Sequence, residues 1–244
     1  MFKYQDIAMP EECKFKISPS QIDKFFKLPV VWYTENILGE KEDFNSTAMA
    51  LGTVCHHVFE LVGKGEPVNK DYIEEQVVGI EDDNVNALEV LDNYVPIVES
   101  VVNEYLLANM PTKTEYQVYT EVKEGIYVGG SIDNVTNSIV VDYKNVSTKP
   151  NDKQIPFNYK IQLLAYAYIL NRNNYFIDRI RIVYGVRPTK TLPARTIVVT
   201  EEIGYQDWEM IENTLELMAD TVLLVKEKPE LAYLLFKSMR LKEE

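Results

Sequence analysis

Two aspartates and one lysine lie near the ends of two predicted β-strands. Asp142 lies nine residues after Asp133, and Lys144 follows two residues later, with apolar runs at 127–128 and 139–141 beside them. Because side chains alternate along a strand, Asp142 and Lys144 share one face. Carboxylates bind hard divalent cations, and an adjacent lysine can orient a water or stabilise charge on a phosphate. The pattern indicates metal-assisted hydrolysis of a phosphodiester, although a charged strand end at the surface would also contain these residues.

A helix predicted over residues 46–63 carries a second polar pair. Its apolar residues recur at helical spacing, and Ser46 or the threonine after it is a candidate N-cap. His56 and Glu60 are four residues apart and therefore share a face. Only one of His56 and His57 can face the same neighbour, because a helix turns about 100° per residue.

A further helix, predicted over residues 157–171, places Gln162 and Tyr166 on one face by the same spacing. The order of these motifs resembles the PD-(D/E)XK nuclease superfamily, and more narrowly its RecB-like exonuclease branch. Residues 17–29 also resemble the opening motif of that branch, so the resemblance covers roughly residues 17–171. The motifs that carry it are His56 with Glu60, Gly130 with Asp133, Asp142 with Lys144, and Gln162 with Tyr166.

The resemblance implies a catalytic metal site for Mg²⁺ or Mn²⁺. Asp133 and Asp142 would be direct ligands, His56 a third, and the backbone carbonyl of Tyr143 a fourth. Lys144 would position the attacking water or offset the charge that develops on the phosphate. Imidazole suits Mn²⁺ better than Mg²⁺, so Mn²⁺ is expected to support higher activity.

Three more residues have expected roles beside this metal site. Glu60 would join a second metal or orient the ligands, unless it is a solvated helix charge. Gln162 and Tyr166 would hold the attacked strand near the metal, although Tyr166 is also compatible with a place in the core.

Many members of the RecB-like branch hold an iron–sulfur cluster on four cysteines, one of them just before the proline of the opening motif. This chain has Leu28 at that position, and its two cysteines are Cys13 and Cys55. Because such a cluster takes four thiolates, we expect no iron–sulfur cluster. Two cysteines far apart in sequence also favour free thiols in a reducing cytoplasm.

The charge distribution bears on nucleic-acid binding. The net charge of −13 is unusual for a protein that binds polyanions without specificity. Residues 151–195, however, contain eight basic and only two acidic side chains, which predicts one basic region in an acidic body. Within it, Lys160, Arg187 and Lys190 are candidate DNA contacts, unless these cations decorate solvated strand edges.

The chain is long enough to bury a full core, and we expect one nuclease domain over residues 1–244. The pattern predicts a mainly helical part over 1–110, the catalytic sheet with the Gln–Tyr helix over 111–204, and C-terminal helices over 205–244. Strands are predicted near 114–123, 125–134 and 137–144, with a turn from Asn134 to Ser138, and near 178–186 and 194–200. This order predicts an α/β fold with a restriction-endonuclease-like core, in which a mixed sheet is flanked by helices.

The leading interpretation is a metal-dependent DNA exonuclease of recombination, repair or phage DNA processing that acts on ends or single strands. A structure-specific endonuclease is the second possibility, because the fold supports both. The third is a catalytically silent protein that binds a protein partner through its acidic surface. No apolar run reaches the roughly 18 residues of a membrane helix, so we expect a cytoplasmic protein of a bacterial cell or a phage-infected host.

Overall fold

Six strands form one mixed sheet in the part of the chain that the structure, a computed structural model, describes, residues 6–41 and 45–237. The strand order is β1-β3-β4-β5-β6, and β2 pairs with β3. The β1–β3 and β4–β5 pairs are parallel and the others antiparallel. The strands are β1 (Phe15–Ile17), β2 (Lys113–Lys123), β3 (Ile126–Thr136), β4 (Ile139–Val146), β5 (Arg179–Val186) and β6 (Arg195–Glu202).

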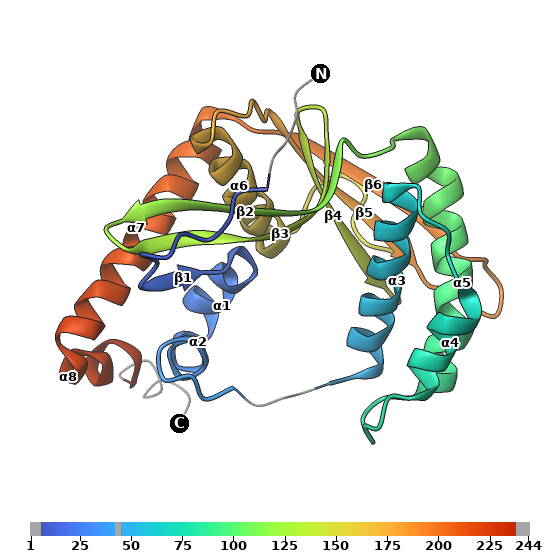
Figure 1. Cartoon of the computed structure of the whole chain (residues 1–244), viewed down its shortest axis with the longest axis horizontal. Helices are drawn as coiled ribbons and strands as arrows, with labels where there is room; N and C mark the ends of the chain where they lie inside the picture. Colours follow the sequence, from blue (N-terminus) through green and yellow to red (C-terminus); the bar gives the residue numbers. More distant parts are fainter. Residues whose placement is uncertain (1–5, 42–44, 238–244) are drawn as a thin grey trace.

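Helices stand on both sides of this sheet. Figure 1 shows α1, α2, α7 and α8 on one side of the molecule and α3, α4 and α5 on the other, with the strands above and between them. The helices are α1 (Ile22–Lys27), α2 (Pro29–Asn36), α3 (Thr47–Lys64), α4 (Lys70–Val78), α5 (Ala87–Glu104), α6 (Phe157–Arg172), α7 (Tyr205–Glu227) and α8 (Pro229–Ala232). Short helical turns cover Pro19–Gln21, Leu106–Ala108 and Tyr233–Lys237.

Two hydrophobic clusters lie on the two faces of the sheet. One contains most of α6 together with α7, α1 and the inward side chains of β2 and β3, such as Tyr116 and Val118. The other joins α3, α4 and α5 to β4 through side chains such as Val58, Ile97 and Tyr143. Because neighbouring β4 residues point to opposite faces, the strand presents Tyr143 to α3 while Asp142 and Lys144 point toward α6. Asp142 and Lys144 therefore lie on the face of β4 that α6 covers, whereas Tyr143 packs under α3 on the other face.

One edge of β3 is open at its centre. β2 pairs with β3 along nearly its whole length, so β1 and β4 share the opposite edge. On that edge β1 pairs with residues 126–128 and β4 with 134–136, which leaves residues 129–133 without a neighbouring strand. Asp133 therefore lies at an interruption of the sheet, where its carboxylate can meet side chains from the helices.

Local sequence explains where α3 begins and ends. The Ser46 hydroxyl accepts a hydrogen bond from the backbone N–H of Met49 at 3.3 Å, which caps the N-terminus. Gly65 ends the helix in the left-handed conformation, with φ of 73°. The sequence prediction of this helix over 46–63 is thereby confirmed within one residue at each end.

The predicted mixed sheet flanked by helices is confirmed, but one local prediction was wrong and one strand was missed. Asn134 does not begin a turn: it continues β3, pairs with Val141 and donates from Nδ2 to the Tyr143 hydroxyl at 2.9 Å. The turn is confined to Asn137 and the following serine, and Asn137 has the positive φ of 53° that asparagine tolerates. Strand β1 was not predicted, because three residues are too short to show a period.

None of the helices in the described residues combines the length and the apolar character that crossing a membrane needs.

Candidate active site

The candidate active site lies where β3 and β4 separate. These strands pair only over Asn134–Thr136 and Ile139–Val141. Asp133 and Asp142 are the next residues on the two strands, so both carboxylates stand at the fork. The backbone N–H of Tyr143 donates to Asp133 Oδ2 at 2.8 Å, which ties the two strands together at this point.

Asp142 is buried between Lys144 and Gln162. Its side chain is 7% exposed, and its two oxygens lie 3.0 and 2.9 Å from Lys144 Nζ. Gln162 Nε2 on α6 donates to Asp142 Oδ1 at 3.1 Å. Burial and the neighbouring charge of Asp133 raise the pKa of Asp142 to about 6, although Lys144 opposes the shift. An ionised Asp142 is thus costly in the folded protein, a cost that an electropositive ligand would offset.

Asp133 and Tyr143 both contact His56 of α3. His56 Nδ1 lies 3.4 Å from Asp133 Oδ2, and Nε2 lies 2.9 Å from the Tyr143 carbonyl oxygen. The three groups come from β3, β4 and α3, and the packing of α3 on β4 brings them together. Burial raises the pKa of the Asp133 carboxyl, but the hydrogen bond and charge of His56 reverse this and lower it.

If His56 is a metal ligand, as the sequence predicts, proton release should accompany metal binding. Burial lowers the pKa of His56, but the hydrogen bond and charge of Asp133, with that of Asp142, raise it to about 9. At pH 7 a metal ion must therefore displace one proton from this ring, and we expect Mn²⁺ affinity to rise roughly tenfold per pH unit between about pH 7 and 9. Titration calorimetry in buffers of different ionisation enthalpy measures that proton. The His56→Gln variant should lose both the proton release and the slope; a slope near zero in the wild type would contradict the assignment.

Glu115 is a site residue that the sequence interpretation missed. It lies on β2 between Thr114 and Tyr116, whose partners Asn134 and Ile132 flank Asp133 on β3, and it accepts a hydrogen bond from Ser131 Oγ at 2.6 Å. Its φ of 46° is in the left-handed region, which is rare for a residue with a side chain and is seen where structure imposes a conformation. Burial, and then the charges of Asp133 and Glu60, raise the pKa of Glu115, against the effect of Ser131. A single glutamate in a predicted strand matches no motif, so the sequence does not mark Glu115 as a candidate ligand. Only its place beside Asp133 in the folded sheet does so.

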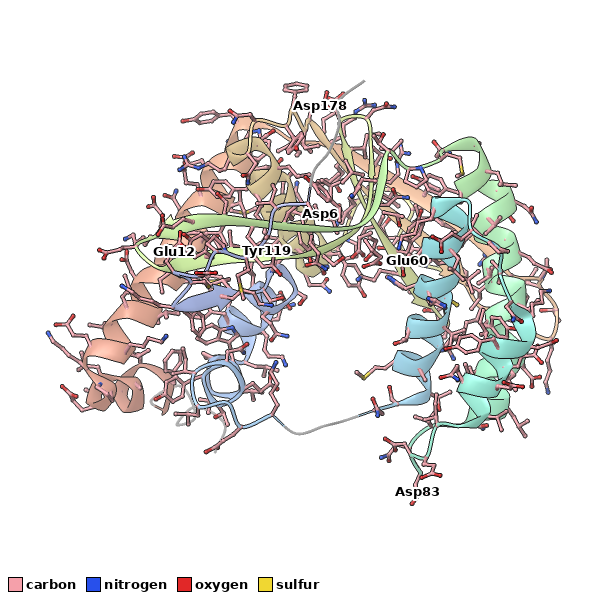
Figure 2. The ribbon with its side chains drawn as sticks, in the orientation of Figure 1. Asp6, Glu12, Glu60, Asp83, Tyr119 and Asp178 are labelled. Carbon is pink, nitrogen blue, oxygen red and sulfur yellow. The ribbon has the colours of Figure 1, made fainter. Side chains whose placement is uncertain are left out.

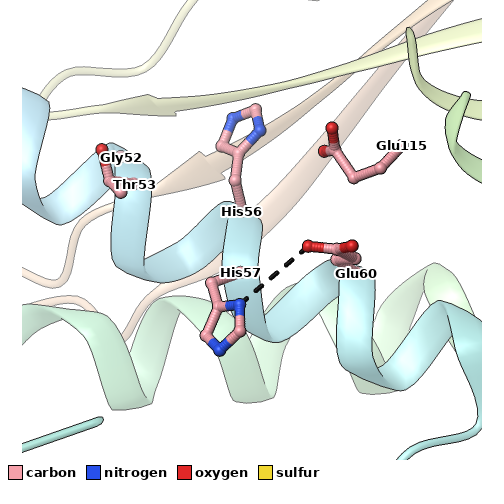
Figure 3. A pocket seen from close by; sticks show the side chains of 6 residues that line it. All are labelled: Gly52, Thr53, His56, His57, Glu60 and Glu115. Carbon is pink, nitrogen blue, oxygen red and sulfur yellow. Dashed lines mark ion pairs between the residues drawn. The ribbon is translucent and has the colours of Figure 1, made fainter. Parts of the chain in front are cut away.

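A pocket of about 580 Å³ opens at these residues. Figure 3 shows His56 and Glu115 pointing toward one another across it, with Glu60 and His57 on the helix below. Glu60 is ion-paired with Lys64 on the next turn, and its other oxygen lies 4.0 Å from His57 Nδ1. Figure 2 shows Glu60 where α3 approaches the strands. The pocket is lined by Gly52, Thr53, His56, His57, Glu60 and Glu115.

The side chains present suit a hard divalent cation. Ligand atoms of His56, Glu115 and Asp133 all lie within 4.8 Å of one another. Two of these three, His56 and Asp133, were predicted as ligands, and Glu115 was not. Asp142, the other carboxylate predicted as a ligand, contacts Lys144 and Gln162. One imidazole and two carboxylates form a donor set typical of Mn²⁺ or Mg²⁺ sites. The residues present therefore fit a divalent metal ion.

Aromatic rings enclose the polar groups on the α6 side. Lys144 Nζ lies 5.3 Å from the centre of the Tyr159 ring, so a carboxylate and an aromatic face hold it from two directions. A Cβ on Gly130 would lie 3.1 Å from the Tyr166 hydroxyl, so the glycine allows Tyr166 to approach the open edge of β3. Tyr166 is 6% exposed, and burial, followed by the charges of Asp133 and Asp142, raises its pKa. Tyr166 therefore belongs both to the core and to the wall of the site.

The predicted DNA-binding cations do not form one free surface. Lys160 is ion-paired with Glu201 at 3.1 Å and with Asp207 at 2.9 Å. Arg187 NH1 lies 3.0 Å from Glu89 of α5, and only 17% of the Arg187 side chain is exposed. Lys190 lies in the exposed loop between β5 and β6. Carboxylates from distant segments thus neutralise two of the three.

Comparison with known proteins supplies a family and a fold. The model of the PD-(D/E)XK nuclease superfamily matches residues 16–227, nearly the whole chain. No curated protein matches the sequence.

Among solved structures, a protein from Eubacterium rectale named "Putative exonuclease" superposes with a TM-score of 0.61 at 16% identity, over 91% of this chain and 87% of that one. Two others are more distant. LHK-Exo in complex with dAMP gives a TM-score of 0.39 at 12% identity, over 80% and 97% of the two chains. SSO0001 gives 0.37 at 15% identity, over 82% and 86%. At such low identity, the first similarity shows a shared fold only.

Proposed function

This chain belongs to the PD-(D/E)XK nuclease superfamily, and on that premise we propose that it is a metal-dependent DNA exonuclease. The observation that carries the proposal is the fork between β3 and β4. There Asp133 meets His56 and the Tyr143 backbone, while Asp142 meets Lys144 and Gln162. A buried carboxylate, Asp142, and the mostly covered carboxylate of Asp133 repel one another beside a single lysine, which is costly to maintain and supports an active site over a silent one.

Each polar group has a distinct task in this proposal. His56, Asp133, Asp142 and the Tyr143 carbonyl, joined by Glu115, would hold Mg²⁺ or Mn²⁺. When bound, such a cation lowers the pKa of a water and neutralises charge on the phosphate. Lys144 Nζ, fixed by Asp142 and the face of Tyr159, adds a positive charge where the phosphate develops negative charge.

The α6 residues position the site and its substrate. Gln162 holds Asp142 Oδ1 through its amide, which orients that carboxylate. Tyr166 approaches the open edge of β3 beside Gly130, where it would contact the strand that is cut. Glu60, between Lys64 and His57, would orient the groups of the pocket. DNA as the substrate, and a place in recombination, repair or phage DNA processing, follow from the resemblance to the RecB-like branch.

The decisive experiment compares end-labelled linear DNA with circular single-stranded and circular duplex DNA. Each is incubated with Mn²⁺, Mg²⁺ or EDTA. An exonuclease should release label from linear DNA only, with Mn²⁺ or Mg²⁺ and not with EDTA. Cleavage of the circles would favour the endonuclease alternative, and intact DNA with no Mn²⁺ binding in calorimetry would refute the nuclease proposal. RNA of the same length tests the choice of DNA.

Glu115→Gln is expected to weaken Mn²⁺ binding by about 10- to 100-fold, the range seen when a group of a metal site loses its charge or its orientation. Glutamine has the size of Glu115 and would keep its backbone conformation, so a loss of Mn²⁺ affinity would come from the missing negative charge. Calorimetry with Mn²⁺ measures it. Glu124→Gln is the matched control, because its side chain is 93% exposed just after β2 and should leave affinity unchanged. Equal affinities of the two variants would remove Glu115 from the metal site.

A further inference from the structure

Tyr184 of β5 carries a buried hydroxyl group on the side of the sheet that α6 covers. The side chain is 1% exposed and belongs to the hydrophobic cluster that contains α6 and α7. In the described part of the chain its hydroxyl has no hydrogen-bond partner. A buried hydroxyl without a partner lowers stability, so its retention calls for an explanation.

The pairing of β4 with β5 places Tyr184 directly beside Lys144. The two residues are partners in the register of this parallel pair. Neighbouring strands of a sheet lie about 4.8 Å apart, and paired side chains point to the same face. Lys144 lies on the α6 face with Asp142, so Tyr184 flanks it there. Because tyrosine and lysine side chains have similar lengths, the hydroxyl and the ammonium group stand at a similar height above the sheet.

The Tyr184 hydroxyl also lies within electrostatic reach of the candidate catalytic groups. Burial, followed by the charges of Tyr159 and Asp142, raises the pKa of Tyr184 to about 12. The phenol therefore stays protonated at neutral pH, and its oxygen can accept a hydrogen bond. The Tyr159 ring lies 5.3 Å from Lys144 Nζ. Asp142, Tyr159 and Tyr184 thus lie around one ammonium group.

Lys144 and a metal ion would compete for the same carboxylate. Lys144 Nζ lies 3.0 and 2.9 Å from the two oxygens of Asp142, the carboxylate that the proposed function assigns to the metal. With a cation on Asp142, the ammonium group would meet a like charge and lose at least one of these contacts. Only 25% of the Lys144 side chain is exposed, so water can replace the lost contact only in part. A largely buried ammonium group in that position needs another acceptor nearby.

We propose that Tyr184 is a positioning residue whose hydroxyl oxygen accepts a hydrogen bond from Lys144 when Asp142 binds the metal ion. The inference rests on the proposed nuclease function and adds a residue to its site. In the structure Lys144 is paired with Asp142. Transfer of one Nζ hydrogen bond to Tyr184 would free an Asp142 oxygen for the cation and keep the positive charge beside the phosphate. Tyr184 acts through Lys144 and contacts no reacting atom.

The test is a double-mutant cycle in which titration calorimetry measures Mn²⁺ affinity. Tyr184→Phe removes only the hydroxyl, so Lys144 should stay on Asp142 and Mn²⁺ should bind about 10- to 100-fold more weakly, the range for one hydrogen bond to a charged group. The Mn²⁺ concentration that gives half-maximal cleavage of labelled linear DNA should rise by the same factor. In the Lys144→Met background no ammonium group competes for Asp142, so addition of Tyr184→Phe should leave Mn²⁺ affinity unchanged.

Tyr168→Phe is the matched control. Tyr168 lies in the same hydrophobic cluster at 9% exposure, but the charges that act on its hydroxyl are those of Arg172 and two glutamates of α7. Its loss should leave Mn²⁺ affinity unchanged in both backgrounds. Tyr184→Phe should melt in EDTA at or above the temperature of the wild type, since the hydroxyl that it lacks has no partner among the described residues. Lys144→Gln provides a second background without the charge if Lys144→Met folds poorly.

The outcomes separate this inference from the nuclease proposal. Unchanged Mn²⁺ affinity in Tyr184→Phe, or an equal loss with and without Lys144→Met, would overturn the role of Tyr184 while labelled DNA is still degraded. A wild type that binds Mn²⁺ but hydrolyses neither DNA nor bis(p-nitrophenyl) phosphate would overturn the nuclease proposal. Because the cycle measures Mn²⁺ binding, a loss confined to proteins that retain Lys144 would still support the role of Tyr184 in that case.

Discussion

Asp142→Asn is expected to abolish nuclease activity, with a loss of kcat of about a thousandfold or more, at the upper end of what removal of one electrostatic group at a catalytic site costs. Asparagine has nearly the same shape but no negative charge, so it cannot attract the metal ion or hold the ammonium group of Lys144 as an ion pair. Mn²⁺ affinity should fall as well. End-labelled linear DNA at pH 8 measures the loss, well above the pKa of about 6 at which Asp142 ionises.

The same substitution should not destabilise the fold. Burial and the charge of Asp133 raise the pKa of Asp142 in the folded protein, so its ionised form lowers stability as pH rises through 4 to 6, and this cost persists at pH 8. Asparagine removes this cost but leaves the largely buried Lys144 ammonium without its ion pair, so the melting temperature should stay close to that of the wild type. Activity lost through unfolding would instead appear as a lower melting temperature.

Asp83→Asn is the matched control for this experiment. Asp83 lies in the exposed turn between α4 and α5, far from the strands in Figure 2. The control makes the same chemical change and should leave kcat, Mn²⁺ affinity and melting temperature as in the wild type. An active Asp142→Asn enzyme would show that the β3–β4 fork is not the catalytic centre.

Lys144→Met is expected to lower kcat by about 10²- to 10³-fold while Mn²⁺ affinity is kept or increased. Methionine retains much of the apolar stem that packs beside Tyr159 but removes the charge at Nζ. Because Lys144 repels a cation held by the neighbouring carboxylates, its loss should not weaken the metal. The two variants therefore differ in kind: Asp142→Asn affects metal and chemistry, whereas Lys144→Met affects chemistry alone.

Calorimetry with Mn²⁺ and single-turnover cleavage of labelled DNA separate these effects. Lys149→Met is the control, since Lys149 is half-exposed beyond β4 and pairs with Asp152. Loss of metal affinity in Lys144→Met would mean that the lysine organises the ligands, and full activity would exclude a role for its charge in the reaction.

Local sequence predicted much of the fold. Helix α3 could be placed from the spacing of its apolar residues, the cap at Ser46 and the glycine at 65, because these signals act within one or two turns of the chain. Strands β4 and β5 followed from short apolar runs between turn residues. The turn after β3 was misplaced, because Asn134 favours turns by itself but is held in the strand by its partners Val141 and Tyr143.

The candidate site was also predicted only in part. The sequence by itself determined the order of His56, Asp133, Asp142 and Lys144 along the chain. It also placed Asp142 and Lys144 on one face of a strand, because side-chain alternation is a local property. Only the tertiary structure decided which groups meet them. Glu115 joins the site because β2 pairs with β3, and its unusual φ cannot be read from residue types.

Lys160 and Arg187 were interpreted as candidate DNA contacts, yet carboxylates on β6, α7 and α5 pair with them. Glu89 lies 98 residues before Arg187 in the chain, and no local pattern signals such a contact. Periodicity and capping act over a few residues, whereas ion pairs and pockets depend on how distant elements pack. This is why the sequence determined the candidate catalytic residues while the structure decided their surroundings.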